Sequence, residues 1–145
     1  MSVLLVRHAK AGDREKWDAP DDLRPLTAKG ETQAEALVDQ LAGYEIDRVL
    51  SSPYLRCTQT VAPLAAARGL AVEPCDDLAE GEGHAGITLA RRLLADPRFT
   101  VLCSHGDVVE GVLDAFGVER EQFTRKGATW VLEEAGARHL AAPAS

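Results

Sequence analysis

Two arginines and two histidines follow short apolar runs of this 145-residue chain. Arg7 and His8 come directly after the first run, and Arg56 and His105 come shortly after two later runs. A neutral imidazole is a good nucleophile toward phosphorus, because the phosphoramidate that it forms is readily hydrolysed. Guanidinium groups bind phosphoryl oxygens as a fork and stabilise the charge of a phosphoryl transition state. These residue types therefore indicate phosphoryl transfer.

Glu80 is the candidate general acid of such a reaction, because a nearby carboxylic acid can protonate a departing oxygen. It follows the third apolar run and has Asp76, Asp77 and Glu82 beside it. A run of charges is also typical of a solvated surface, so a catalytic and a purely structural role both stay open for Glu80. His84, in the same region, is a weaker candidate for a substrate contact.

Four further residues are candidate substrate contacts: Lys10, Arg14, Ser52 and Gly106. The first two lie in or beside residues 11–25, the longest stretch without regular periodicity. An irregular segment of that length is usually functional, although a solvated loop is an equally good interpretation of its charged residues. The other two stand where helices are expected to begin, and the free N–H groups of a helix N-terminus attract anions.

Continuous apolar runs predict the strands that position these residues. Such runs are typical of strands buried on both faces of a parallel sheet, and they cover residues 3–6, 46–50, 70–72 and 99–103. A further strand is expected over residues 128–132, at or near an edge of the sheet, and a short one over residues 138–140.

The segments between the strands have helical spacing. Thr27 is placed to cap the first helix, with Glu31 in its first turn. Ser52 is expected to cap the second helix and Gly69 to end it, while Pro63 should kink it or split it in two. Apolar residues over 87–94 and 108–116 mark two more helices, which Asp96-Pro97 and Gly117 end.

Alternating strands and helices predict a three-layer α/β/α sandwich with a mostly parallel central sheet. In such sheets the ligand lies outside the carboxyl ends of the strands. The polar residues after each strand should therefore meet in one crevice, although they are far apart in the sequence.

Composition narrows the functional classes. A length of 145 residues indicates one domain over residues 1–145, and the formal net charge of −7 argues against binding to nucleic acid or to anionic membranes. Three widely spaced cysteines form neither a disulfide framework nor a zinc motif, which fits a reducing, cytoplasmic compartment. We expect no cofactor and no metal site.

The order and spacing of the motifs resemble the histidine phosphatase superfamily, which has the phosphoglycerate mutase-like fold, and within it the short SixA-type phosphohistidine phosphatases. Similar domains are appended to some MutT-like Nudix hydrolases. The resemblance rests on four segments: Leu5 to Ala9; Arg24 to Thr27 with Gly30 and Gln33-Ala34; Ser51 to Pro53 with Arg56 and Gln59-Thr60; and Ser104 to Gly106.

This resemblance implies that His8 is the phosphorylated nucleophile. It also implies that Arg7, Arg56 and His105 hold the phosphoryl group and that Glu80 is the general acid. Ala9 stands where many members have glycine, which bears on the subgroup. Lys10 stands where the mutase branch often has an acidic residue, which argues against mutase activity.

The expected function is a metal-independent phosphatase of the histidine acid type, acting on a phosphorylated protein or a small phosphorylated substrate. No strand is followed by a long insertion that could enclose a small metabolite, which favours protein phosphohistidine over nucleotide or sugar phosphates. A phospho-ligand binding module without turnover is the alternative from another class. The oligomeric state is left open.

Overall fold

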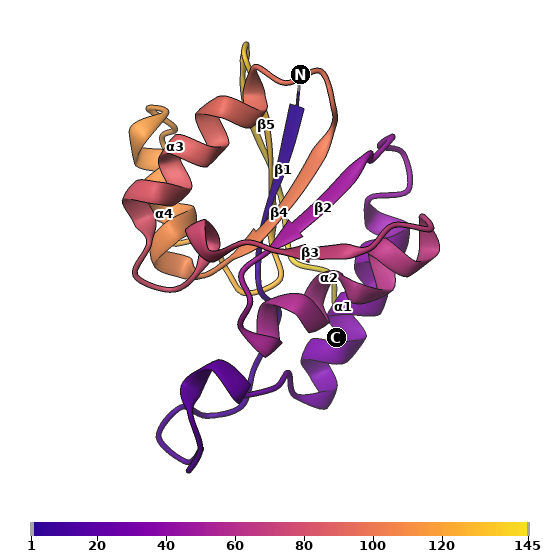
Figure 1. The fold of residues 1–145 in the computed structure, drawn as a ribbon, viewed down its shortest axis with the longest axis vertical. Coiled ribbons are helices and arrows are strands. Elements are labelled where there is room, and N and C mark those ends of the chain that lie inside the picture. The colour runs from indigo at the N-terminus through magenta and orange to yellow at the C-terminus, as the bar shows by residue number, and fades with distance from the viewer. Residues whose placement is uncertain (1, 145) are drawn as a thin grey trace.

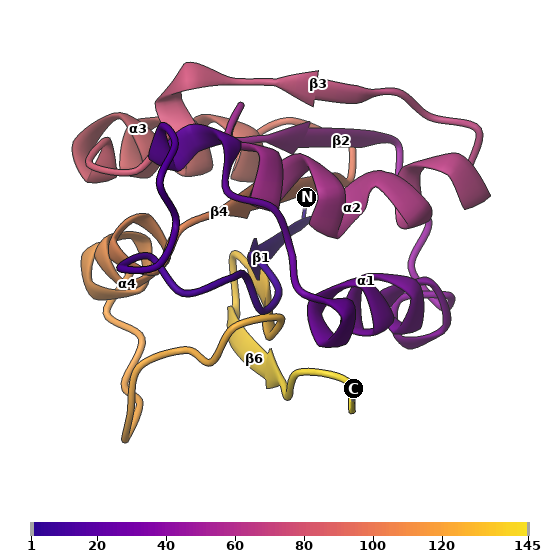
Figure 2. The ribbon, with the colours of Figure 1, turned by 90° about the horizontal axis from the view of Figure 1, so that it is seen from below.

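The computed structural model describes residues 2–144, which form helices on both sides of one six-stranded sheet (Figures 1 and 2). The strands are β1 (Ser2–Arg7), β2 (Arg48–Ser51), β3 (Val72–Pro74), β4 (Thr100–Ser104), β5 (Thr129–Glu133) and β6 (Gly136–Leu140), in the spatial order β3-β2-β4-β1-β5-β6. Strands β1 to β4 are parallel, and β5 is antiparallel to both β1 and β6. The three-layer sandwich with a mostly parallel sheet is confirmed.

Four helices make the outer layers: α1 (Ala28–Gln40), α2 (Leu55–Ala67), α3 (Gly83–Leu94) and α4 (Gly106–Ala115). Figure 2 shows α1 and α2 on one side of the sheet, and α3 and α4 on the other. Two short 3-10 helices, η1 (Asp21–Leu23) and η2 (Asp76–Leu78), lie in the connections. In this described part of the chain, no helix has the length and apolar character needed to cross a membrane.

Strand β1 is buried on both faces, as its unbroken apolar run predicts. Val3 and Leu5 belong to the core beneath α3 and α4, whereas Leu4 and Val6 belong to the core beneath α1 and α2. Because side chains alternate across a strand, one short segment anchors both layers. Arg7 and His8, which follow these residues, are therefore tied to the most buried part of the molecule.

Helix α1 begins as expected, because the Thr27 hydroxyl accepts a hydrogen bond from the Gly30 N–H at 3.1 Å. Gly69 and Gly117 adopt the left-handed backbone conformation, with φ of 66° and 70°, and end α2 and α4. Strand β3 begins two residues later than predicted, because the Leu70 N–H closes the end of α2 on the Ala65 carbonyl.

One expectation for α2 is wrong, and one of the two outcomes expected at Pro63 does not occur. The helix begins at Leu55, and Ser52 is not its cap, because the Ser52 N–H donates to the Cys103 carbonyl and its backbone continues the sheet edge. Pro63 does not split the helix, which continues to Ala67. Packing of Val61 and the following turn against the sheet holds the helix together across this position.

Candidate active site

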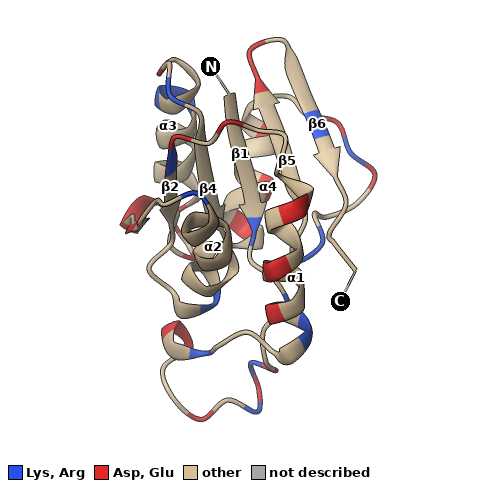
Figure 3. Cartoon of the chain, turned by 90° about the vertical axis from the view of Figure 1, so that its right-hand side faces the viewer, with Lys and Arg blue, Asp and Glu red and all other residues tan. Residues whose placement is uncertain are grey.

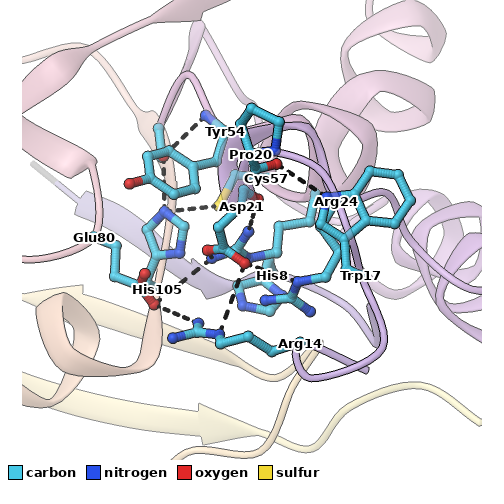
Figure 4. Close-up of polar contacts among 12 residues, drawn as sticks. His8, Arg14, Trp17, Pro20, Asp21, Arg24, Tyr54, Cys57, Glu80 and His105 are labelled. Atoms are coloured by element: carbon cyan, nitrogen blue, oxygen red, sulfur yellow. Dashed lines mark hydrogen bonds and ion pairs between the residues drawn. The ribbon is translucent and has the colours of Figure 1, made fainter. Parts of the chain in front are cut away.

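The carboxyl ends of β1, β2 and β4 bring the predicted residues to one place. His8 follows β1 and His105 follows β4, and their ring centroids lie 5.5 Å apart in an edge-to-face arrangement. Figure 4 shows the two rings next to each other, with Asp21, Arg14 and Glu80 around them. The rule that ligands bind outside the carboxyl ends of parallel strands thus places one candidate site here.

His8 is held in a form suited to nucleophilic attack. Its Nδ1 lies 2.8 Å from the Ala9 carbonyl oxygen, and a carbonyl only accepts, so Nδ1 carries the proton. The lone pair is consequently on Nε2. Burial, and then the positive charges of His105 and the arginines, lower the pKa of His8 to about 3. The ring is therefore neutral at physiological pH.

His105 is oriented by the residues behind it. Its Nε2 lies 2.8 Å from the Ser52 hydroxyl and 3.6 Å from the Cys57 sulfur, and the Tyr54 ring contacts its edge at 4.6 Å between centroids. Its Nδ1 is buried without a hydrogen-bond partner among residues 2–144. Ser52, which the sequence predicts as a substrate contact, therefore contacts the His105 ring.

Arg56 is completely buried, although it is charged. Its guanidinium donates to the Asp21 carbonyl at 2.8 Å and to the Asp21 carboxylate at 2.9 Å, and it lies over the Tyr54 ring. Burial opposes the charge of Asp21, but hydrogen bonds from Arg24 and Arg56 hold the pKa of its carboxyl below the ordinary value. Asp21 thus compensates the charge of Arg56.

Arg7 reaches the site from the end of β1. Its Nη1 donates to the Thr124 carbonyl at 2.6 Å, and burial lowers the pKa of the guanidinium. Gly106, the first residue of α4, lies against this group, because a Cβ at that position would be 3.0 Å from the guanidinium. A glycine here leaves room for Arg7 beside the helix N-terminus.

Three buried nitrogens of the site have no hydrogen-bond partner among residues 2–144: Arg7 Nε, Arg56 Nε and His105 Nδ1. Such groups are rare in native structures, since each costs free energy when it is left unpaired. They belong to two permanent cations and to a ring next to His8. A tetrahedral oxyanion in contact with His8 would supply the missing acceptors.

Glu80 lies at the open side of the site. Its carboxylate accepts a hydrogen bond from Arg14 at 2.8 Å and lies 3.6 Å from Arg56. Its side chain is about one-third exposed, at 32%. Glu80 is therefore a partly exposed carboxylate that lines the same cleft as His8.

A cleft of about 820 Å³ leads to His8. Of the predicted substrate contacts, Arg14 and Gly106 line this cleft, whereas Lys10, Ser52 and His84 do not. The backbone of Lys10 instead anchors the loop after β1, since its carbonyl accepts a hydrogen bond from the Thr27 N–H at 2.9 Å and packs closely against Gly30.

The loop over residues 8–27 is fastened by the polar residues of the sequence motifs. The N–H groups of Ala9, Lys10 and Leu26 donate to side-chain oxygens on α1 and α2, which belong to Thr60, Gln33 and Gln59. The loop projects beyond the carboxyl end of β1 (Figure 1) and carries charges of both signs (Figure 3). These contacts hold Asp21 over Arg56.

Sequence reasoning did not identify Asp21, Glu110, Thr124 or Lys126. Asp21 pairs with Arg56 across 35 residues of sequence, and no local pattern indicates that pairing. The only available signal was the irregular segment 11–25 itself. Within residues 2–144, no three His, Cys, Asp or Glu side chains are grouped so that they could hold a metal ion.

Residues 3–89 match the family model of the histidine phosphatase superfamily, branch 1. The chain belongs to this superfamily. The superfamily members that it resembles include an 8-oxo-(d)GTP phosphatase of Mycolicibacterium smegmatis, to which it is 34% identical over 98% of its own length and 48% of the relative's. Phosphohistidine phosphatase SixA of Escherichia coli is 41% identical over 63 residues, which are 42% of this chain and 37% of SixA. The chain spans about half or less of the length of the curated relatives that it matches.

Solved structures confirm the fold of this superfamily member. The protein histidine phosphatase SixA, complexed with tungstate, superposes with a TM-score of 0.80 and 24% identity, over 99% of this chain and 97% of that one. A putative phosphohistidine phosphatase SixA from Agrobacterium tumefaciens gives a TM-score of 0.79 at 25% identity, over 99% and 98% of the two chains. Phosphatase activity is the function common to these relatives.

Proposed function

We propose that this superfamily member hydrolyses phosphoryl compounds in two displacements, with His8 as the nucleophile. In the first, the Nε2 lone pair of His8 forms a bond to phosphorus while the bond to the leaving group breaks. In the second, water forms a bond to phosphorus, the N–P bond breaks, and inorganic phosphate leaves with His8 restored. Each step is a single in-line substitution, so no oxidant or reductant is needed.

One observation carries this proposal: a neutral imidazole with its lone pair on Nε2 lies beside three buried nitrogens that have no hydrogen-bond partner within residues 2–144. The donors of Arg7, Arg56 and His105 would bind the phosphoryl oxygens. Because these groups are held by Thr124, Asp21 and Ser52, they are in position before the reaction begins. Preorganised donors of this kind stabilise the charge that develops in the transition state.

Glu80 is proposed as the general acid toward an alkoxide leaving group, and then as the base for the attacking water. Its place at the mouth of the cleft, next to Arg14, supports this role. The leaving group of a phosphohistidine substrate is an imidazole, and its departure needs the acid less. The enzyme would then belong to the histidine acid-type phosphatases.

Protein phosphohistidine is our first proposed substrate class. Two similarities support it: phosphohistidine phosphatase SixA is 41% identical over 63 residues, and a solved SixA structure superposes over 99% of this chain with a TM-score of 0.80. Nucleotide phosphates are the second class, because the similarity to an 8-oxo-(d)GTP phosphatase extends over 98% of this chain. The values of kcat/KM for a phosphohistidine peptide and for nucleotides distinguish the two classes.

The test is phosphoryl labelling of His8. Incubation with p-nitrophenyl phosphate, followed by a quench in base, should leave an acid-labile phosphoryl group on His8, which mass spectrometry locates. His8→Asn should abolish both the label and turnover, whereas His139→Gln, on the edge strand β6, should behave like wild type. Wild-type turnover by His8→Asn would refute the mechanism. Tight phosphate binding with neither label nor turnover would favour a binding module.

A further inference from the structure

Lys126 is a cation of the cleft that the proposed chemistry does not use. It lines the cleft together with Arg7, His8 and Arg24, on the segment between α4 and β5. No carboxylate lies within 4.0 Å of its ammonium group in the part of the chain from residue 2 to residue 144. The other lysines of the described chain, Lys10, Lys16 and Lys29, also lack such a partner, but Lys126 is the one among them that lines the cleft.

The backbone on either side of Lys126 is bound to the end of β1. The Gly127 N–H donates to the carbonyls of Arg7 and His8 at 3.1 and 3.0 Å, and the Arg7 N–H donates to the Ala128 carbonyl at 3.1 Å. Gly127 has φ of 86°, a conformation that glycine adopts without strain. Lys126 is thus one residue away from a direct backbone contact with His8, and its backbone position beside the cleft is fixed.

The carboxylates that line the cleft are already bound elsewhere. Each accepts a hydrogen bond from another group, as follows: Asp13 from the Glu15 N–H, Glu80 from Arg14, Asp107 from the Gly81 N–H, Glu110 from Thr124 and Arg120, and Asp114 from Arg120. The charged groups that act on Lys126 are cations: burial, and then Arg7 and Arg24, lower the pKa of its ammonium group. Burial and neighbouring cations therefore both act against the charge of Lys126.

A single phosphoryl group does not account for this charge. Arg14, Arg24 and Arg56 share the two carboxylates of Asp21 and Glu80, which leaves one positive charge. A phosphoryl dianion bound at His8 would compensate that charge and the charge of Arg7. Lys126 would still lack a negative partner, because it extends from the neighbouring segment into the same cleft.

We propose that Lys126 forms a second anion subsite beside His8, so that the cleft selects substrates with another anionic group next to the scissile phosphoryl group. This inference rests on the proposed function, because it assumes that the scissile group is bound at His8. A phosphoryl group or a carboxylate would satisfy Lys126 by the same charge-assisted hydrogen bond. ADP carries a second phosphoryl group and phosphoglycolate carries a carboxylate, so these compounds represent the two kinds of anion. The third substrate, p-nitrophenyl phosphate, has no second anion.

The experiment compares Lys126→Met, which keeps the apolar stem, with wild type on these three substrates. We expect kcat/KM to fall about 10- to 100-fold for ADP, for phosphoglycolate or for both, the range that a hydrogen bond to a charged group covers. For p-nitrophenyl phosphate the loss should be at most about threefold. Lys126→Arg should recover most of the loss, and Lys29→Met, on the exposed surface of α1, should change nothing.

Equal losses on all three substrates, or no loss on any, would overturn the inference. Calorimetric binding keeps this outcome separate from a failure of the proposed function. Even in a protein without turnover, Lys126→Met should weaken the binding of inorganic pyrophosphate about tenfold or more. It should weaken the binding of inorganic phosphate at most about threefold. A variant that binds pyrophosphate as tightly as wild type would refute the subsite directly.

Discussion

The lowered pKa of His8 should appear as a pH dependence of folding stability. The ring is buried and neutral in the folded protein, with a pKa of about 3, whereas in the unfolded chain its pKa is about 6.5. Below pH 6.5 the unfolded chain therefore binds a proton that the folded protein does not. Stability contributed by neutral His8 is present above pH 6.5 and is lost as the pH falls toward 3.

The size of this effect follows from the pKa difference. Each pH unit between the two pKa values costs about 1.4 kcal/mol of unfolding free energy, so about 2 kcal/mol is lost between pH 7.5 and pH 5. His8→Asn removes the titrating ring and retains a donor for the Ala9 carbonyl. Between these two pH values, the unfolding free energy of wild type should fall about 2 kcal/mol further than that of the variant.

Urea denaturation, followed by circular dichroism at pH 7.5 and pH 5, measures this difference. The other histidines and the carboxylates titrate in both proteins, so their contributions cancel in the comparison. An NMR titration should also show that the His8 ring resonances do not shift between pH 7.5 and pH 5. The same pH dependence in both proteins, or a His8 titration near pH 6.5, would refute a neutral buried ring.

Three other predictions concern the site. Arg56→Lys should lower kcat for p-nitrophenyl phosphate about 100-fold, since a lysine lacks the fork that bridges Asp21 and the substrate; a loss under threefold would contradict this. Gly106→Ala should lower kcat/KM about three- to tenfold by displacing Arg7, whereas Gly111→Ala on the same helix, whose Cβ would meet its nearest neighbour at 4.0 Å, should not. Turnover should survive EDTA, because side chains supply the positive charge; activity that zinc restores after chelation would indicate a metal-dependent reaction.

The negative net charge of the chain makes the cations near the site important for binding an anionic substrate. A chain with a formal net charge of −7 repels an anionic substrate at a distance, so attraction must come from cations near the site. Asp21 holds the Arg56 guanidinium at the site without occupying its Nε, and Thr124 holds Arg7 in the same way. A fixed partner thus orients each cation and leaves its Nε without a hydrogen bond to the described residues.

Local patterns predicted the elements well, because the cause of each pattern is local. The run Val3 to Val6 has to be buried on two faces, and Thr27 caps a helix with its own hydroxyl. Ser52 shows the limit of such reasoning. A serine before a proline is typical of a helix cap, but here the Cys103 carbonyl and the His105 ring, both distant in sequence, bind its N–H and its hydroxyl.

The sequence alone determined the alternation of strands and helices, and with it the end of the sheet where Arg7, His8, Arg56 and His105 meet. Tertiary structure decided that His8 is neutral, that Asp21 compensates Arg56, and that Lys126 is left without a carboxylate. These properties depend on burial and on distances between groups that the chain separates widely. Charge interactions and desolvation act through space, so only the folded arrangement sets the charge state and the partner of each group.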